Sequence, residues 1–310
     1  MHGEALRLRR AVGDRRFESA SLMNLGSVAE AQGDWSGAET LYRQSLALYR
    51  ELQDLPGIAS TLSNLGRLQS RSGHLTAASE NLAEALSVQQ ELGHREKEAE
   101  TLEFLADLNR IQGEVTAAED SLSRAREIYR AVGAPSGEAQ ALLSLAELAI
   151  DRLGGPAARA LAEEADRIAG QGPTPLFECS LERLKGLIEG SEGRPEEAAR
   201  HLRRALRLSR DLGHREAEAI ISTDLARLLL DSGAATGAQE ALAGIPPGWR
   251  RSGAVLGLRA RVAAAGGDFR AAADLGRQAR EASREAWTDD DELALEGYLQ
   301  AIGVGAEAPP

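Results

Sequence analysis

The chain of 310 residues contains little of what marks many enzymes and secreted proteins. It has one cysteine, Cys179, which excludes an intramolecular disulfide and any cysteine cluster. Aromatic residues make up only 4%, and no run of about 18 apolar residues occurs, so we expect no membrane span. The first ten residues contain no apolar segment typical of a signal peptide. We therefore expect a cytoplasmic protein.

Positive charge is scarce as well. Lys97 and Lys185 are the only lysines, and the formal net charge is −12, with a pI of about 5.1. Direct binding of nucleic acid needs basic surfaces, so we do not expect it. The abundant residues are alanine, leucine, glutamate and arginine, which favour helices, and a hydrophobic content of 43% is enough for a packed core.

Residues 21–50 show the pattern that the rest of the chain repeats. Two amphipathic segments flank a tight turn at Gly33 and Asp34, and each has apolar or small residues three and four positions apart. Gly26 in the first segment and Ala38 in the second lack bulk, so two helix backbones can approach closely there. The stretch therefore predicts a helical hairpin.

The same residue types recur at a period of 40. Small residues occupy Gly26, Gly66, Ala106, Ala146, Gly186 and Ala226, and alanine occupies 38, 78, 118, 158, 198 and 238. A third column contains Tyr42, Leu82, Leu122, Ala162, Leu202 and Leu242. Turn glycines recur at 33, 73, 113, 193 and 233, and Gly154–Gly155 interrupts this row in the fourth copy. A second row of glycines, at 13, 93, 133 and 213, marks further helix ends. A fixed period of this length predicts a solenoid of stacked hairpins.

The pattern of Leu25–Gly26, Ala38, Tyr42 and Ser45 resembles the tetratricopeptide repeat (TPR). The usual period of that family is about 34 residues, and here it is 40. This long form is similar to the repeats of kinesin light chain, of G-protein-coupled spindle adaptors and of helical sensor arms in bacterial transcription regulators. The resemblance implies an all-α fold, a right-handed α-α superhelix of about seven hairpins.

We expect four regions along the chain. Residues 1–13 read as a half repeat, the second helix of a preceding unit, and residues 14–247 as six units of about 40 residues. Residues 248–287 form a shorter seventh unit, and 288–310 a capping helix and tail. The half repeat leads to the hypothesis that the chain is the C-terminal part of a longer protein, or that another surface, including that of a second copy, covers Leu6 and Leu8.

Motifs that carry chemistry are absent from the sequence. There is no phosphate-binding P-loop, no Gly-x-Ser-x-Gly elbow and no paired His/Cys spacing, so we expect neither enzymatic activity nor a metal or cofactor. His94 and His214 stand three repeats apart in copies of one loop, which favours a structural or solvated role. Cys179 is expected to be a buried, inert thiol.

In the TPR family the first helix of each repeat lines the inner groove. That resemblance implies partner-binding residues at the groove-facing positions, namely Asn24, Ser27, Asn64, Arg67, Arg71, Asp107, Arg110, Glu147, Asp224 and Arg227. Asn24 and Asn64 occupy one repeat position, where an amide can donate to and accept from an extended peptide backbone. Arg67 and Arg71, one turn apart, are placed to share a carboxylate. Each of these residues, taken singly, also fits a solvated helix face.

Two hypotheses of function follow. The first is a scaffold that binds a peptide or partner helix in the concave groove. The alternative is a ligand- or peptide-sensing C-terminal arm of a larger bacterial signalling or transcription regulator. An upstream P-loop or helix-turn-helix in the intact gene would favour the second hypothesis.

Overall fold

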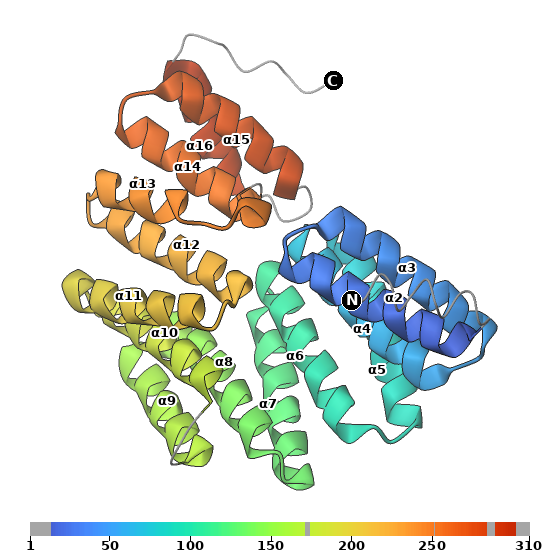
Figure 1. Cartoon of the computed structure of the whole chain (residues 1–310). Helices are drawn as coiled ribbons and strands as arrows, with labels where there is room; N and C mark the ends of the chain where they lie inside the picture. Colours follow the sequence, from blue (N-terminus) through green and yellow to red (C-terminus); the bar gives the residue numbers. More distant parts are fainter. Residues whose placement is uncertain (1–13, 171–173, 251, 284–288, 302–310) are drawn as a thin grey trace. The chain divides into compact units, whose positions relative to one another are not determined.

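The computed structural model describes residues 14–170, 174–250, 252–283 and 289–301, and these are helical with no strand among them. The predicted half repeat at 1–13, including Leu6 and Leu8, lies outside the described residues. Fifteen α-helices follow one another in this part of the chain, and a short 3-10 turn, η1 (Pro247–Trp249), stands between α13 and α14 (Figure 1). None of the described helices is both long and apolar enough to cross a bilayer.

The helices pair in order as seven successive hairpins, and α16 follows the last of them. The first helices are α2 (Arg15–Ala31), α4 (Leu55–Arg71), α6 (Arg95–Ile111), α8 (Pro135–Leu153), α10 (Pro175–Ser191), α12 (Arg215–Asp231) and α14 (Gly253–Ala265). The second helices are α3 (Trp35–Glu51), α5 (Leu75–Glu91), α7 (Val115–Val132), α9 (Gly155–Ala169), α11 (Pro195–Asp211), α13 (Ala235–Ala243) and α15 (Phe269–Ser283). The last helix is α16 (Asp289–Ala301). The all-α hairpin architecture that the sequence predicts is confirmed.

The first six first helices begin at intervals of 40 residues, from Arg15 to Arg215. Local signals fix helix starts of both kinds. The Asp54 carboxylate accepts from the backbone N–H of Gly57 at 3.1 Å at the start of α4, a first helix. The Asp34 carboxylate accepts from the backbone N–H of Gly37 at 2.9 Å at the start of α3, a second helix. Glycines end many of the helices in the left-handed conformation, with φ of 80° at Gly33 and 67° at Gly93. At the position equivalent to Gly93, the chain has Gln53, with φ of 53°.

The small-residue columns form the helix crossings. The alanines at 38, 78, 118, 158, 198 and 238 are all 0% exposed. A Cβ atom added to Gly66 would lie 2.6 Å from Leu82 Cγ and 3.2 Å from the backbone oxygen of Ala78. In this hairpin α4 therefore lies against α5 at a distance that leaves no room for a side chain at position 66.

The chain divides into two compact units. The first contains residues 1–148 and 161–171, and the second contains 149–160 and 172–310. In the first unit, Tyr42, Leu46 and Tyr49 of α3 pack with Leu62 and other residues of α4 in one core cluster. In the second unit, a cluster of Leu202, Leu206, Ile221 and Leu225 joins α11 to α12. Each hairpin thus shares its apolar face with the next hairpin of the same unit.

Polar pairs recur where one hairpin meets the next within a unit. Each pair joins the end of a second helix to a glutamate eight residues later: Gln90 to Glu98 at 3.2 Å, Arg130 to Glu138 at 2.8 Å and Arg210 to Glu218 at 2.7 Å. Glu98 is 0% exposed and is also paired with Arg95 and Arg124. These pairs tie neighbouring hairpins together at one end.

The last hairpin consists of α14, with 13 residues, and α15, with 15 residues. Gly267 has φ of 81°, and the Asp268 carboxylate accepts from the backbone N–H of Ala271 at 3.0 Å to start α15. On α16, Leu295 is 2% exposed and packs over Gly276 of α15. Leu293 of the same helix is 64% exposed. It lies about half a turn from Leu295, which places it on the opposite side of α16.

Candidate functional site

The predicted asparagines lie at equivalent points of two adjacent first helices, α2 and α4. Asn24 is exposed and Asn64 is half-buried. Among the residues that the structure describes, neither side-chain amide has a hydrogen-bond partner. Ser27, one turn after Asn24, is also exposed, and its hydroxyl oxygen lies 3.0 Å from the hydroxyl oxygen of Tyr42, within hydrogen-bond distance. The two amides therefore offer donors and acceptors that the fold itself does not use.

A buried carboxylate joins α2 to its neighbours. Glu30 is 2% exposed, and its Oε2 accepts a hydrogen bond from the Tyr42 hydroxyl at 3.0 Å. Arg67 Nη1 lies 2.8 Å from Glu30 Oε1, and Arg71 Nη1 lies 3.4 Å from the same oxygen. Burial and the negative charge of Glu30 raise the pKa of Tyr42 above its ordinary value.

Arg67 and Arg71 therefore do share a carboxylate, as their spacing suggests, but it belongs to the chain itself. Their side chains are 25% and 18% exposed, so only part of each guanidinium reaches solvent. The Arg67 guanidinium also lies 5.4 Å from the ring centroid of Phe104 on α6. A polar row thus connects three consecutive hairpins of the first unit.

Three of the predicted residues meet in a hollow between α6 and α8. Asp107, Arg110 and Glu147 line it together with Ser144, above a floor that includes Ala106 and Leu122. Its volume is about 270 Å³, open solvent included. Asp107 is 68% exposed, and Arg110 Nη2 lies 3.9 Å from its carboxylate. The hollow is smaller than the pockets that enclose drug-sized ligands.

Glu103, on the same helix, forms a site of its own. Its Oε2 accepts a hydrogen bond from the Tyr129 hydroxyl of α7 at 2.8 Å. Burial raises the pKa of Glu103 to about 7, although the Tyr129 hydrogen bond opposes this shift; Asp107 and Glu100 add to the increase. This carboxyl group therefore changes its charge close to neutral pH.

In the second unit, the predicted pair has a structural role. Asp224 is only 7% exposed, and its Oδ2 accepts a hydrogen bond from Arg183 Nε on α10 at 2.6 Å. Arg227 Nη1 lies 3.8 Å from the other carboxylate oxygen. Asp224 thus ties α12 to α10 much as Glu30 ties α2 to α4.

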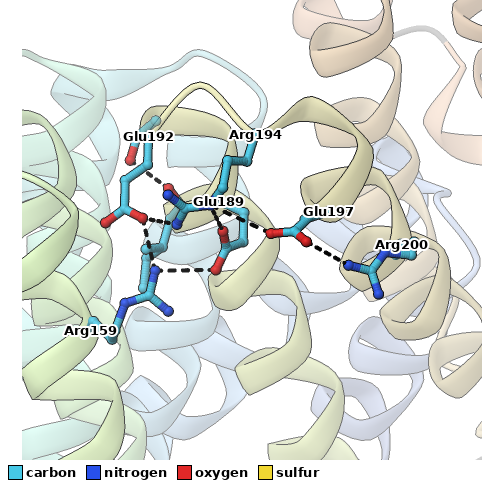
Figure 2. A network of polar contacts seen from close by, with 8 residues as sticks. Arg159, Glu189, Glu192, Arg194, Glu197 and Arg200 are labelled. Atoms are coloured by element: carbon cyan, nitrogen blue, oxygen red, sulfur yellow. Dashed lines mark hydrogen bonds and ion pairs between the residues drawn. The ribbon is translucent and has the colours of Figure 1, made fainter.

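A dense ionic network occupies the end of α10. Figure 2 shows its labelled members: Arg159, Glu189, Glu192, Arg194, Glu197 and Arg200. Arg159 bridges Glu189 at 3.1 Å and Glu192 at 2.9 Å, and Arg194 pairs with both carboxylates. Hydrogen bonds from Arg194 and Arg159 lower the pKa of Glu189, while burial opposes them. Every carboxylate here is matched by arginine, so the network holds α9, α10 and α11 together.

The remaining candidates for chemistry have structural surroundings. Cys179 is 1% exposed and its thiol donates to the backbone oxygen of Ala205 at 3.4 Å, while burial raises its pKa. His214 Nδ1 accepts from the backbone N–H of Ala217 at 3.2 Å and caps α12. Within the described residues, no three His, Cys, Asp or Glu side chains are grouped to hold a metal ion.

Sequence reasoning did not anticipate the Glu30–Tyr42 pair or the Arg183–Asp224 pair. Tyr42 provides a signal in retrospect, because the equivalent residues are Leu82, Leu122 and Leu202. A tyrosine in a leucine column carries a hydroxyl that needs a buried partner. Glu30 lies three residues after Ser27 on the same face and is within reach of that hydroxyl.

Comparison with protein families decides the identity of the repeats. Two models described as tetratricopeptide repeat match the chain, one over residues 1–51 and 17–91 and the other over residues 191–262. The chain belongs to the tetratricopeptide repeat family. A search of curated proteins finds no match. TPR arrays stack hairpins into extended surfaces on which other molecules bind.

Solved TPR structures share the fold at low sequence identity. A tetratricopeptide repeat protein from Parabacteroides merdae is 18% identical, with a TM-score of 0.52 over 91% of this chain and 98% of its own. BtubC (BKLC) from P. vanneervenii is 21% identical, with a TM-score of 0.55 over 68% of this chain and 89% of its own. A Rap protein complexed with Competence and Sporulation Factor is 14% identical, with a TM-score of 0.56 over 93% and 98%. These similarities concern the fold.

Proposed function

We propose that this TPR protein is an interaction scaffold that binds an extended peptide or a partner helix along the first helices of its N-terminal unit. The observation that carries the proposal is the pair of unpartnered amides, Asn24 and Asn64, at equivalent points of α2 and α4. An amide that both donates and accepts can pair with the N–H and C=O of one peptide residue. The 40-residue period places two such amides on adjacent hairpins.

A polar hollow lined by later first helices of the same unit supports a peptide rather than a small molecule. Arg110 and Glu147 line this hollow together with the exposed carboxylate of Asp107, and it is too small to enclose a drug-sized ligand. Mixed charges at this point favour a polar or charged side chain of a peptide. We therefore propose Asn24, Ser27, Asn64, Asp107, Arg110 and Glu147 as contact residues.

Arg67 and Arg71 have a different place in this proposal. Because both are held by Glu30, they are not free to take up a partner's carboxylate. Asp224 pairs with Arg183 and Arg227 within the second unit, so neither Asp224 nor Arg227 belongs to the proposed contact residues. No residue of this set suggests enzymatic chemistry, and we propose a cytoplasmic location for the scaffold.

The proposal is tested by selecting peptides from a displayed library against the purified chain and measuring their affinities by fluorescence anisotropy. Asn24→Ala combined with Asn64→Ala should weaken the selected peptides about tenfold or more, because two backbone-binding amides are lost. Gln44→Ala combined with Gln239→Ala, which removes two exposed amides from second helices, is the matched control and should leave affinity unchanged. Equal affinities for all three proteins would show that the first helices are not the binding surface.

The alternative is a sensing arm of a larger bacterial regulator. It is supported by the fold similarity to a Rap protein whose structure contains Competence and Sporulation Factor, and to RapI, which is 12% identical with a TM-score of 0.56. The two proposals share a peptide ligand and differ in what binding does. Reading the gene upstream of Met1 distinguishes them, because a regulator should encode an ATPase or DNA-binding region there.

A further inference from the structure

The second helix α11 carries an arginine face that the rest of the fold does not explain. Residues 200–210 contain five arginines and no acidic residue, in a chain with a net charge of −12. Arg200, Arg203, Arg204 and Arg207 are all exposed. Their spacing of three, four and seven residues places them on one side of the helix, along about 10 Å of its length. We call these four residues the α11 arginine face.

Much of this charge is not neutralised within the protein. Arg203 and Arg207 form no ion pair with any residue that the structure describes. Arg200 pairs with Glu197 at 3.0 Å (Figure 2). The two side chains are 70% and 48% exposed, so water screens this pair. Arg204 lies 3.6 Å from Glu182, which already binds His201 at 2.8 Å. The face therefore retains most of its positive charge.

The other repeats provide an internal comparison. At the same four positions α5 has Glu80, Ala83, Glu84 and Ser87, α7 has Asp120, Ser123, Arg124 and Glu127, and α9 has Ala160, Glu163, Glu164 and Arg167. The formal charges of these three sets are −2, −1 and −1, whereas the formal charge of the α11 arginine face is +4. Because the other hairpins stack with net-negative sets at these positions, with one arginine at most, stacking does not require four arginines here.

We propose that the α11 arginine face binds an acidic helical segment of another protein, separately from the surface on the first helices. A partner helix with glutamates at positions i, i+3, i+4 and i+7 has the same rise and can match the four arginines in number. Arginine is suited to this task because its guanidinium pairs with carboxylates in a bidentate way. The face is one helix wide, since the next second helix, α13, has Glu240 at the equivalent position and no arginine. This width fits a single segment better than a nucleic-acid duplex.

The test uses a fluorescein-labelled helical peptide with glutamates at this spacing on an alanine and glutamine background. Its affinity for the full chain is measured by anisotropy at low and at physiological salt. Arg203→Glu with Arg207→Glu should weaken binding about tenfold or more, because both unpaired arginines become repulsive. The matched control is Arg167→Glu with Arg270→Glu, which changes the net charge equally at two exposed arginines on α9 and α15. The control should stay within about twofold of wild type, and circular dichroism should show that both variants are folded.

Four results would overturn the proposal. A peptide with glutamine in place of glutamate that binds equally well would exclude charge recognition. An equal loss in the control variant would show that net charge alone is responsible. Tighter binding of a single-stranded oligonucleotide of matched charge, lost in the same variant, would assign the face to nucleic acid. Concentration-dependent self-association of the wild type that Arg203→Glu with Arg207→Glu abolishes would assign it to a second copy of the chain.

Discussion

Arg67 Nη1 of α4 lies 2.8 Å from Glu30 Oε1 of α2, across the junction of the first two hairpins. The same carboxylate accepts the hydroxyl hydrogen of Tyr42, so one buried acid joins three helices. Since Glu30 is 2% exposed, its charge depends on these partners for the solvation that water would otherwise supply. The cluster stabilises the junction and also positions the surface beside Asn64.

Glu30→Gln should lower the free energy of unfolding by about 2–4 kcal/mol, because two partly buried arginines lose their counter-charge. The measurement is the urea midpoint and slope followed by circular dichroism. Glu84→Gln is the control, since Glu84 pairs with Arg50 at a site where both side chains are about half exposed. That substitution should cost no more than about 0.5 kcal/mol. Similar losses in both variants would contradict the role assigned to Glu30.

Gly66→Ala should destabilise the protein by about 1–3 kcal/mol, although alanine is the better helix former. The reason is the crossing with α5, where the new methyl group would lie 2.6 Å from Leu82 Cγ. Gly257→Ala in α14 is the matched control, because its methyl group would meet no atom within 4 Å. It should stabilise the protein by about 0.5–1 kcal/mol. Thermal unfolding compares the two, and a stabilised Gly66→Ala variant would show that the crossing has room.

Gln53→Gly should stabilise the chain by about 0.5–1 kcal/mol. Gln53 has φ of 53°, a left-handed conformation that costs a residue with a side chain about 1 kcal/mol. Glycine removes this strain, and the gain exceeds the extra conformational entropy that a glycine loses when the chain folds. The reciprocal change, Gly93→Gln, places glutamine at φ of 67° and should destabilise by a similar amount. Calorimetric melting temperatures of both variants are the readout. Shifts of equal sign would rule out backbone strain as the cause.

Glu103 should make stability depend on pH between about 4.5 and 7. Its pKa is raised to about 7 in the folded protein, so the folded state binds the proton more tightly than the unfolded state. This contribution is fully present below about pH 4.5 and is lost as the pH rises through 7. Glu103→Gln keeps an acceptor for Tyr129 without a charge to bury.

The free energy of unfolding of the Glu103→Gln variant should therefore exceed that of the wild type by about 2 kcal/mol at pH 8 and by little at pH 4.5. Melting temperatures across this pH range provide the measurement. Glu80→Gln, an exposed glutamate on α5, should show no such difference between the two pH values. A gain for Glu103→Gln that is equal at both pH values would exclude titration of Glu103 as its source.

The sequence was sufficient to predict the helices and their crossings, because both depend on the spacing of residues within one hairpin. The period of 40 identified the columns of small residues where the helices of a hairpin cross, and the alanines of the 38 column are completely buried. Turn glycines predicted where helices end. These features depend on a few neighbouring residues and on steric exclusion, which repeat in each copy of the hairpin.

The candidate site was less predictable, because its polar contacts are made between hairpins. Helix periodicity placed Arg67 and Asp224 on first helices, but it did not show that Glu30 and Arg183 face them from the preceding repeat. Such pairs vary from copy to copy, so the period carries no signal for them. The exposure of Asn24 and the burial of Asp224 likewise depend on neighbours about 40 residues away in sequence.

The pairs between a helix end and a glutamate eight residues later have a consequence for the order in which the protein loosens. Glu98, Glu138 and Glu218 join hairpin to hairpin through side chains, whereas backbone hydrogen bonds hold each helix. Two of these three contacts are ion pairs with an exposed arginine, and dissolved salt screens ion pairs but leaves backbone hydrogen bonds unchanged. Concentrated salt should therefore weaken the seams between neighbouring hairpins of one unit before the helicity of the hairpins declines.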